Sequence, residues 1–182
     1  MQDISLNILD IAQNSVCAKS GIIFITVDQQ QHDDILTVTI ADNGCGMSSD
    51  TLKRAADPFY TTRKTRKVGL GLSLFKMAAI QTGGSFEITS SEGKGTTVRA
   101  VFVLSNIDRM PLGDVGGTVL TLIICNPLID FVYIRRFNNR EFELDTRKMR
   151  EVLGDVALNQ IEVIEFIKSY INDGEKELME VL

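Results

Sequence analysis

Polar residues recur every three or four positions in an otherwise apolar segment near the start of the chain, residues 3–18. The polar positions are Asp3, Asn7, Asp10 and Asn14. Isoleucine, leucine and valine fill the other side of the helical wheel, and a period of about 3.6 residues is typical of an amphipathic helix. The pattern predicts a helix with one polar stripe that ends near Gly21.

Four later segments alternate apolar and polar residues, which predicts strands with one buried face. They are residues 22–28, 35–42, 85–91 and 96–104. Between the second and third strands we expect a short helix at about 50–56, capped by Ser48 or Ser49 and stopped by Pro58, and a second helix within 69–84. Because strands and helices do not alternate, the order predicts an α+β fold, with helices on one face of a mixed, mostly antiparallel sheet.

A polar stretch with proline and glycine, residues 105–117, marks a candidate boundary between a domain at 1–104 and a small C-terminal α/β extension at 105–182. The extension is predicted to contain strands at 118–125, 129–137 and 140–145 and helices at 146–153 and 160–181. Its apolar run is interrupted near Pro127 and is too short for a membrane span, which needs ~20 residues. We expect the extension either to pack against the sheet and cover an edge strand, or to offer a surface for a partner or for self-association.

Composition narrows the class of function. The chain of 182 residues has a net charge of −5, which argues against general binding to nucleic acids or anionic membranes. The three cysteines, Cys17, Cys45 and Cys125, are not spaced along the sequence as a zinc or redox pair, and we expect a reducing, cytoplasmic location. The single histidine, His32, lies in a polar run and is predicted to be solvated in a hairpin turn.

The segment DNGCGM, residues 42–47, leaves a predicted strand and turns sharply. Gly44 and Gly46 permit a positive φ or a close approach of the backbone to a ligand. The carboxylate of Asp42 can accept a hydrogen bond from an amino group such as that of adenine. The alternative is a plain Asx-Gly turn with no ligand.

Three further segments each allow a ligand-binding and a plain interpretation. GLGL, residues 69–72, either opens a helix whose N–H groups and dipole favour a phosphate, or forms a hinge. RKTRK, residues 63–67, is either a solvated loop or a lid that brings Arg or Lys to phosphates. EGKGTTV, residues 92–98, is by itself a hairpin.

In order and spacing, these segments resemble the five sequence boxes of the ATP-binding superfamily of gyrases, histidine kinases and mismatch-repair proteins, which have the Bergerat fold. The boxes read NILDIAQNSVCA, DNGCGM, DPFYTT, GLGLSLFKMAA and GKGTTV, and they cover about residues 4–104. From DPFYTT to GTTV the chain is most similar to bacterial histidine kinase catalytic domains. NSVCA and DNGCGM look equally like the mismatch-repair ATPases.

The resemblance implies a two-layer α/β sandwich that holds ATP between its helices and a lid. Asp42 would bind the adenine amino group, directly and through a water shared with Thr96. Gly44 and Gly46 would shape the adenine pocket, and Met47 would touch the base.

The resemblance also implies where the phosphates and a metal ion would bind. Asn14 would give an amide oxygen to Mg²⁺, an ion that prefers oxygen ligands. The phosphate-binding residues would be Lys67, Gly69, Leu70, Gly71 and Leu72.

Two positions depart from the pattern of the relatives. The ATPase branches carry a glutamate general base four residues before the asparagine, many histidine kinases carry an amide there, and this chain has Asp10. Asp10 is therefore either a general base or an exposed helix carboxylate. Cys17 stands where mismatch-repair relatives have an acidic residue and many kinases a basic one, and we expect it to be a small buried residue.

The favoured function is a Mg²⁺-dependent ATP-binding protein with slow ATPase activity, in which the nucleotide state controls the lid and a partner contact. One alternative is a serine/threonine or histidine protein kinase acting in trans, like the anti-sigma-factor kinases. Another is an ATP sensor that does not hydrolyse its ligand. Because the sequence contains neither a phosphoacceptor histidine nor a dimerising helical hairpin, we do not expect a self-contained sensor kinase.

Overall fold

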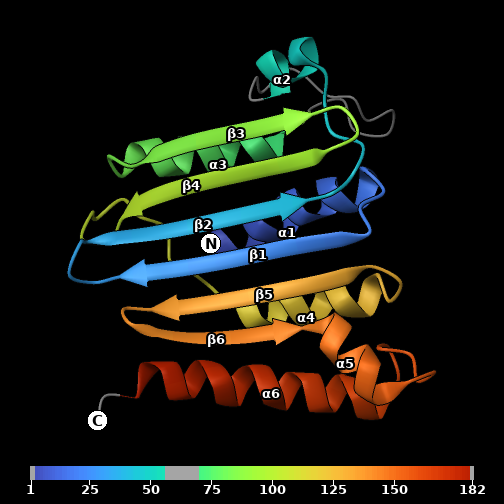
Figure 1. Cartoon of the computed structure of the whole chain (residues 1–182). Helices are drawn as coiled ribbons and strands as arrows, with labels where there is room; N and C mark the ends of the chain where they lie inside the picture. Colours follow the sequence, from blue (N-terminus) through green and yellow to red (C-terminus); the bar gives the residue numbers. More distant parts are fainter. Residues whose placement is uncertain (1–2, 56–69, 181–182) are drawn as a thin grey trace.

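The computed structural model describes residues 3–55 and 70–180 (Figure 1). In these residues, six strands form one sheet in the order β3-β4-β2-β1-β5-β6. The strands are β1 (Ile22–Gln30), β2 (Ile35–Asp42), β3 (Ser85–Ser91), β4 (Gly95–Val103), β5 (Asp130–Phe137) and β6 (Arg140–Asp145). The helices are α1 (Ile4–Cys17), α2 (Ser49–Ala55), α3 (Leu70–Gln81), α4 (Val115–Cys125), α5 (Thr146–Leu153) and α6 (Ile161–Met179).

The sheet is mixed. β1 runs parallel to β5, and the other neighbouring pairs are antiparallel. Figure 1 shows α1, α3 and α4 together on one face of the sheet. The predicted α+β class, with helices on one face of a mixed, mostly antiparallel sheet, is confirmed.

The core lies between this face and the helices, and alternation along the strands supplies its side chains. In the β1–β2 hairpin, Ile25 lies opposite Ile40 and Val27 lies opposite Val38, and all four side chains are buried. The turn between the two strands carries the exposed His32, as predicted. From the helix layer, α1 adds Ile4, Ile8 and Ile11 to the same cluster.

One prediction of secondary structure is wrong. Residues 118–125 were predicted to be a strand because they are rich in β-branched side chains, but they belong to α4, which begins at Val115. The carboxylate of Asp114 accepts a hydrogen bond from Gly117 N at 2.7 Å and so caps the helix. The buried side chains of α4 recur at helical spacing, at Val115, Val119, Leu122 and Ile123. Burial of this face outweighs the weak helix propensity of the residues.

The C-terminal elements continue the same sheet. β5 adds to the edge of β1, and β6 follows it, with α6 running beside β6 at the outer edge (Figure 1). α6 packs on this edge through Ile167 and Ile171, which are buried, while Ile161 at its start is 72% exposed. A side chain at Gly174 would overlap Phe142, so glycine lets α6 lie directly on β6.

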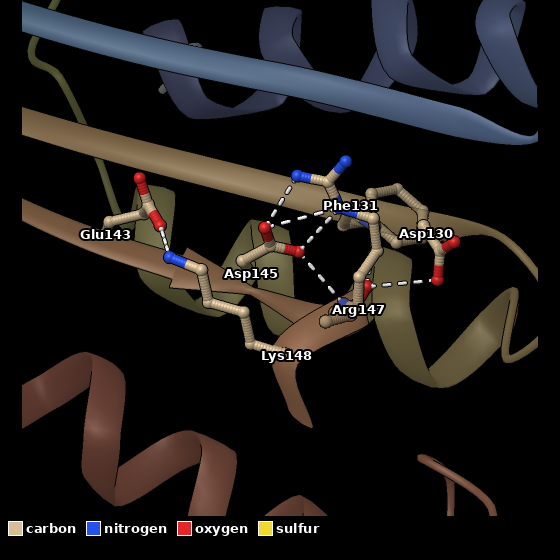
Figure 2. A network of polar contacts seen from close by, with 7 residues as sticks. Asp130, Phe131, Glu143, Asp145, Arg147 and Lys148 are labelled. Atoms are coloured by element: carbon tan, nitrogen blue, oxygen red, sulfur yellow. Dashed lines mark hydrogen bonds and ion pairs between the residues drawn. The ribbon is translucent and has the colours of Figure 1, made fainter. Parts of the chain in front are cut away.

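A polar network joins β5, β6 and α5 at one end of the sheet. Asp145 caps α5 by accepting a hydrogen bond from Arg147 N at 2.9 Å, and it also pairs with the Arg147 guanidinium at 2.7 Å. Thr146 Oγ1 accepts a hydrogen bond from Phe131 N at 2.8 Å. Figure 2 shows Asp145 facing Arg147, with the ion pair of Lys148 and Glu143 beside them. The buried Asp145 carboxylate therefore fixes where β6 ends and α5 begins.

Asp145 gives the first testable prediction. Replacing Asp145 by alanine removes the helix cap, so the free energy of unfolding at pH 7 should fall by about 1 kcal/mol or more. Hydrogen bonds from Arg147 hold the pKa of Asp145 below its ordinary value. A carboxylate of this kind stabilises the fold above its unfolded pKa, and that contribution is lost as the pH falls through its folded pKa. The difference in the free energy of unfolding between wild type and variant should therefore begin to shrink as the pH falls below about 4.

The matched control is Glu143→Gln. This change breaks the ion pair with Lys148, whose side chain is 70% exposed, and surface pairs contribute little. The control should unfold at the same urea concentration as the wild type at pH 7 and at pH 3. Equal losses in the two variants, or an Asp145→Ala loss that does not shrink between pH 7 and pH 3, would contradict the assignment.

Candidate functional site

Asp42 stands at the end of β2, where this strand meets α1. Ser15, a buried residue of α1, donates a hydrogen bond from Oγ to Asp42 Oδ2 at 2.6 Å. The main-chain N–H of Gly44 donates to Asp42 Oδ1 at 2.8 Å. Each carboxylate oxygen can accept a further hydrogen bond, so a positioned carboxylate remains able to receive an amino group. Ser15 is a residue that the sequence analysis did not assign to the site.

The turn after Asp42 is fixed from several sides. Cys45 N donates to Ala18 O at 2.9 Å, which holds the turn to the end of α1. Gly93 N donates to Cys45 O at 2.8 Å, and Met47 N donates to Ser90 Oγ at 2.9 Å, which hold it to the β3–β4 hairpin. The segment is therefore a rigid turn between the helix layer and the sheet.

At Gly44 and Gly46, the two glycines of the turn, the surrounding atoms leave no room for a side chain. A side chain at the buried Gly44 would lie 2.7 Å from Ser20 Oγ and 2.8 Å from Ala18 Cβ. Gly46 has a φ of +65°, and a Cβ there would overlap the main-chain oxygen of Ser91. Only glycine lets the backbone approach so closely at these two positions.

Thr96 lies beside Asp42. The two residues are direct partners in the β2–β4 pairing. Thr96 Oγ1 is 2.9 Å from Ser90 Oγ, the hydroxyl that also accepts from Met47 N. The structure thus brings Asp42 and Met47 of one segment together with Thr96, which is about fifty residues further along the chain, at one end of the sheet.

α1 and the start of α3 form the other side of the site. Asp10 is exposed and Asn14 is half-buried, one helical turn further along α1. A Cβ at Gly71 would lie 3.3 Å from Asp10 Cβ and 3.7 Å from Asp10 Oδ2, so the first turn of α3 lies against Asp10. Leu72 packs its side chain against the core and faces the site only with its backbone. The N-terminus of α3 therefore opens beside the polar stripe of α1.

Not every predicted residue can be placed. Lys67 and Gly69 lie outside the described residues, as do the basic segment 63–67 and the predicted lid. Leu70 is described as the first residue of α3. Cys17 was expected to be buried and is exposed, because it ends α1 on the side away from the core.

The described residues hold no cluster of three or more histidine, cysteine or acidic side chains with the geometry of a metal site. A protein-built metal cage is therefore not a feature of this part of the chain. Magnesium that is bound mainly through phosphates needs only one or two protein ligands, and a single amide such as that of Asn14 is compatible with this mode. Among the same residues, no helix combines the length and apolar character needed to cross a membrane.

The sequence profile of the family described as histidine kinase-, DNA gyrase B- and HSP90-like ATPase matches residues 1–106. The chain belongs to this family. It contains an ATP-binding domain of the histidine kinase-like kind, and the five sequence boxes lie within the matched residues.

Curated relatives of this ATPase-family chain include bacterial signalling proteins. Sporulation kinase E of Bacillus subtilis (strain 168) is 38% identical over 96 residues, which are 53% of this chain and 13% of that protein. Sensor protein SrrB of Staphylococcus aureus (strain NCTC 8325 / PS 47) is 38% identical over 103 residues, which are 53% of this chain and 17% of that protein. The similarity therefore concerns one domain of much longer proteins.

Two solved structures share the fold. The N-terminal domain of a DNA repair protein has a TM-score of 0.55 at 15% identity, over 80% of this chain and 52% of that one. The MutL ATPase domain of Aquifex aeolicus, complexed with ADP, has a TM-score of 0.50 at 16% identity, over 84% of this chain and 69% of that one. The likeness extends to the fold, and the predicted Bergerat-type sandwich is confirmed.

The turn after Asp42 gives the second prediction. Gly46→Ala should unfold at much lower urea concentration than the wild type, because the new methyl group would strike the Ser91 carbonyl as well as straining the backbone. Gly93→Ala is the matched control, since its φ of +71° imposes similar strain but nothing lies within 4 Å of its Cβ. The control should lose about 1–2 kcal/mol and Gly46→Ala about 2 kcal/mol more. Equal losses would mean that the turn is not tightly packed.

Proposed function

We propose that this ATPase-family chain binds ATP with Mg²⁺ at the end of β2 and hydrolyses it slowly. The observation that carries the proposal is the Asp42 carboxylate, held by Ser15 and by Gly44 N next to a glycine turn and Thr96. An acceptor fixed in this way suits the exocyclic amino group of adenine. The ADP named with the MutL structure supports an adenine nucleotide as the ligand.

The phosphates would extend from the adenine toward the start of α3. Helix N-termini favour phosphates because their first N–H groups have no partner within the helix and the dipole is positive there. The amides of Leu70, Gly71 and Leu72 are at this position. Magnesium, when bound, would neutralise part of the phosphate charge, and the Asn14 amide oxygen would be its ligand from the protein.

Asp10 would orient or deprotonate the water that attacks the γ-phosphate. Its support is its place on α1, one turn before Asn14 and directly against Gly71, where the chain of phosphates would end. Aspartate is one methylene shorter than the glutamate of the ATPase relatives, so the reach to the water is longer and the rate is expected to be low. The lid and the partner contact stay predictions. The role of residues 105–182 as a C-terminal extension also stays a prediction.

Asp42 gives the direct test of binding. Asp42→Asn replaces one acceptor oxygen by an amide group that donates, so affinity for Mg²⁺-ATP in a calorimetric titration should fall at least about tenfold, the equivalent of losing one hydrogen bond to a charged group. The control is Asp33→Asn in the exposed turn at the opposite end of β2, which should bind like the wild type. Equal affinity of wild type and Asp42→Asn would overturn the assignment of the pocket.

Asp10 gives the test of the reaction. Asp10→Asn should bind Mg²⁺-ATP at least as tightly as the wild type and release phosphate about 10²–10⁴ times more slowly, the range for loss of a positioned general base. The measurement is phosphate release under single-turnover conditions. If wild type and variant release phosphate at the same rate above background, Asp10 is not the base. If ATP stays intact with the wild type, the chain is a sensor that binds without hydrolysis.

A protein kinase acting in trans is a second candidate, because Sporulation kinase E carries that activity in its name and shares this domain at 38% identity. Incubation of the protein with ATP labelled on the γ-phosphate and a lysate separates the two. Label on a second protein, lost in Asp42→Asn, would favour the kinase. Label recovered only as free phosphate would favour the ATPase.

A further inference from the structure

Two cysteines that are 28 residues apart along the sequence lie on segments that are joined directly at the candidate site. Cys17 is the last residue of α1, and Cys45 lies in the turn after Asp42. Both residues are exposed. The hydrogen bond from Cys45 N to Ala18 O, 2.9 Å long, joins the turn to the residue directly after Cys17. Their spacing along the chain does not predict this pair.

A movement at the end of α1 would bring Cys17 within reach of a disulfide with Cys45. Consecutive Cα atoms lie ~3.8 Å apart, and a disulfide joins Cα atoms up to ~7 Å apart. Cys17 is one such step from Ala18, whose carbonyl is bonded directly to Cys45 N. The last turn of a helix lacks part of its hydrogen bonds and frays. Cys17 can therefore move toward Cys45 with little loss of helix structure. Cys45 gives up only a weak contact from Sγ to Gly46 O at 3.5 Å.

We propose that Cys17 and Cys45 form a reversible disulfide that weakens nucleotide binding at the site. A peroxide is the oxidant. The thiolate of one cysteine attacks a peroxide oxygen, which yields a sulfenic acid and, from hydrogen peroxide, one water. The second thiol then displaces the hydroxyl group as a second water, and the S–S bond forms. Two thiols lose two electrons and two protons, and the peroxide is reduced to two waters.

The disulfide acts on the site through the helix end. The turn that carries Cys45 is held by Gly93 N and by the close packing of Gly46 on β3, so it moves little. The end of α1 moves toward it instead. Asn14 lies in that last turn, and its carbonyl accepts from Ala18 N at 2.9 Å. Displacing this turn displaces the Asn14 side chain, which would hold Mg²⁺ under the proposed function, so the effect on ATP rests on that proposal.

The test uses the full chain, first reduced and then treated with a small excess of hydrogen peroxide. Peptide mapping by mass spectrometry should find a Cys17–Cys45 linkage that lacks two hydrogen atoms. Calorimetric titration with Mg²⁺-ATP should show affinity about tenfold lower after oxidation, with recovery after dithiothreitol. Cys125→Ser is the matched control, since Cys125 is also exposed but ends α4, and this variant should respond like the wild type. Cys17→Ser and Cys45→Ser should each lose the response.

Absence of the linked peptide overturns the proposal, and so does a linked protein that binds ATP as the reduced one does. Loss of the response in Cys125→Ser also overturns it, because that cysteine would then be the true partner. If the reduced protein does not bind Mg²⁺-ATP, the proposed function fails by itself. In that case the peptide map alone decides whether the Cys17–Cys45 disulfide forms.

Discussion

The packing of α1 on the centre of the sheet is the interaction on which both the core and the candidate site depend. Ile4, Ile8 and Ile11 are at most 2% exposed and lie in one cluster with the side chains of β1 and β2. Full burial of such a side chain contributes about 1.5–3 kcal/mol, far more than a solvated polar group on the opposite face. Burial therefore fixes the rotation of α1 about its axis. The positions of Asp10 and Asn14 follow from it, and Ser15, between the two faces, reaches Asp42.

Buried polar contacts then fix how the C-terminal elements join this core. Arg135 is 1% exposed, lies opposite Val27 in the β1–β5 pairing and donates to the Val27 carbonyl and to Gln29 Oε1. Burial lowers the pKa of Arg135 and raises the pKa of Glu175, whose carboxylate on α6 accepts from the Tyr133 hydroxyl. Such groups cost free energy unless each finds its partner, and a shift of β5 by one residue along β1 would break both contacts of Arg135 with β1. The register of the extended sheet is thus specified by polar contacts as well as by apolar ones.

The elements that could be predicted from the sequence are those in which local pattern and burial agree. α1, the β1–β2 hairpin and α6 repeat their buried residues at the period of their own secondary structure. In 118–125 the two signals conflict, since β-branched residues favour a strand while Val115, Val119 and Leu122 recur at helical spacing, and tertiary burial decides. The site was predictable where a motif carries it, at Asp42 and Gly46. Ser15 was missed because its partner Asp42 comes from a segment remote in the sequence, which no local pattern contains. Cys17 was misplaced because it was assigned by residue type, whereas its place at the end of α1 leaves it exposed.

The contact between Asp10 and Gly71 connects the core to the proposed chemistry. Glycine at position 71 leaves room for α3 to begin directly against α1, so the positive end of one helix faces a carboxylate of the other. A carboxylate there is favourable while no nucleotide is bound. Phosphates entering the same space would be repelled by it, and a divalent cation held by Asn14 would offset that repulsion. Under the proposed function, the requirement for Mg²⁺ would therefore arise from Asp10 as well as from ATP, because both place negative charge at the same helix N-terminus.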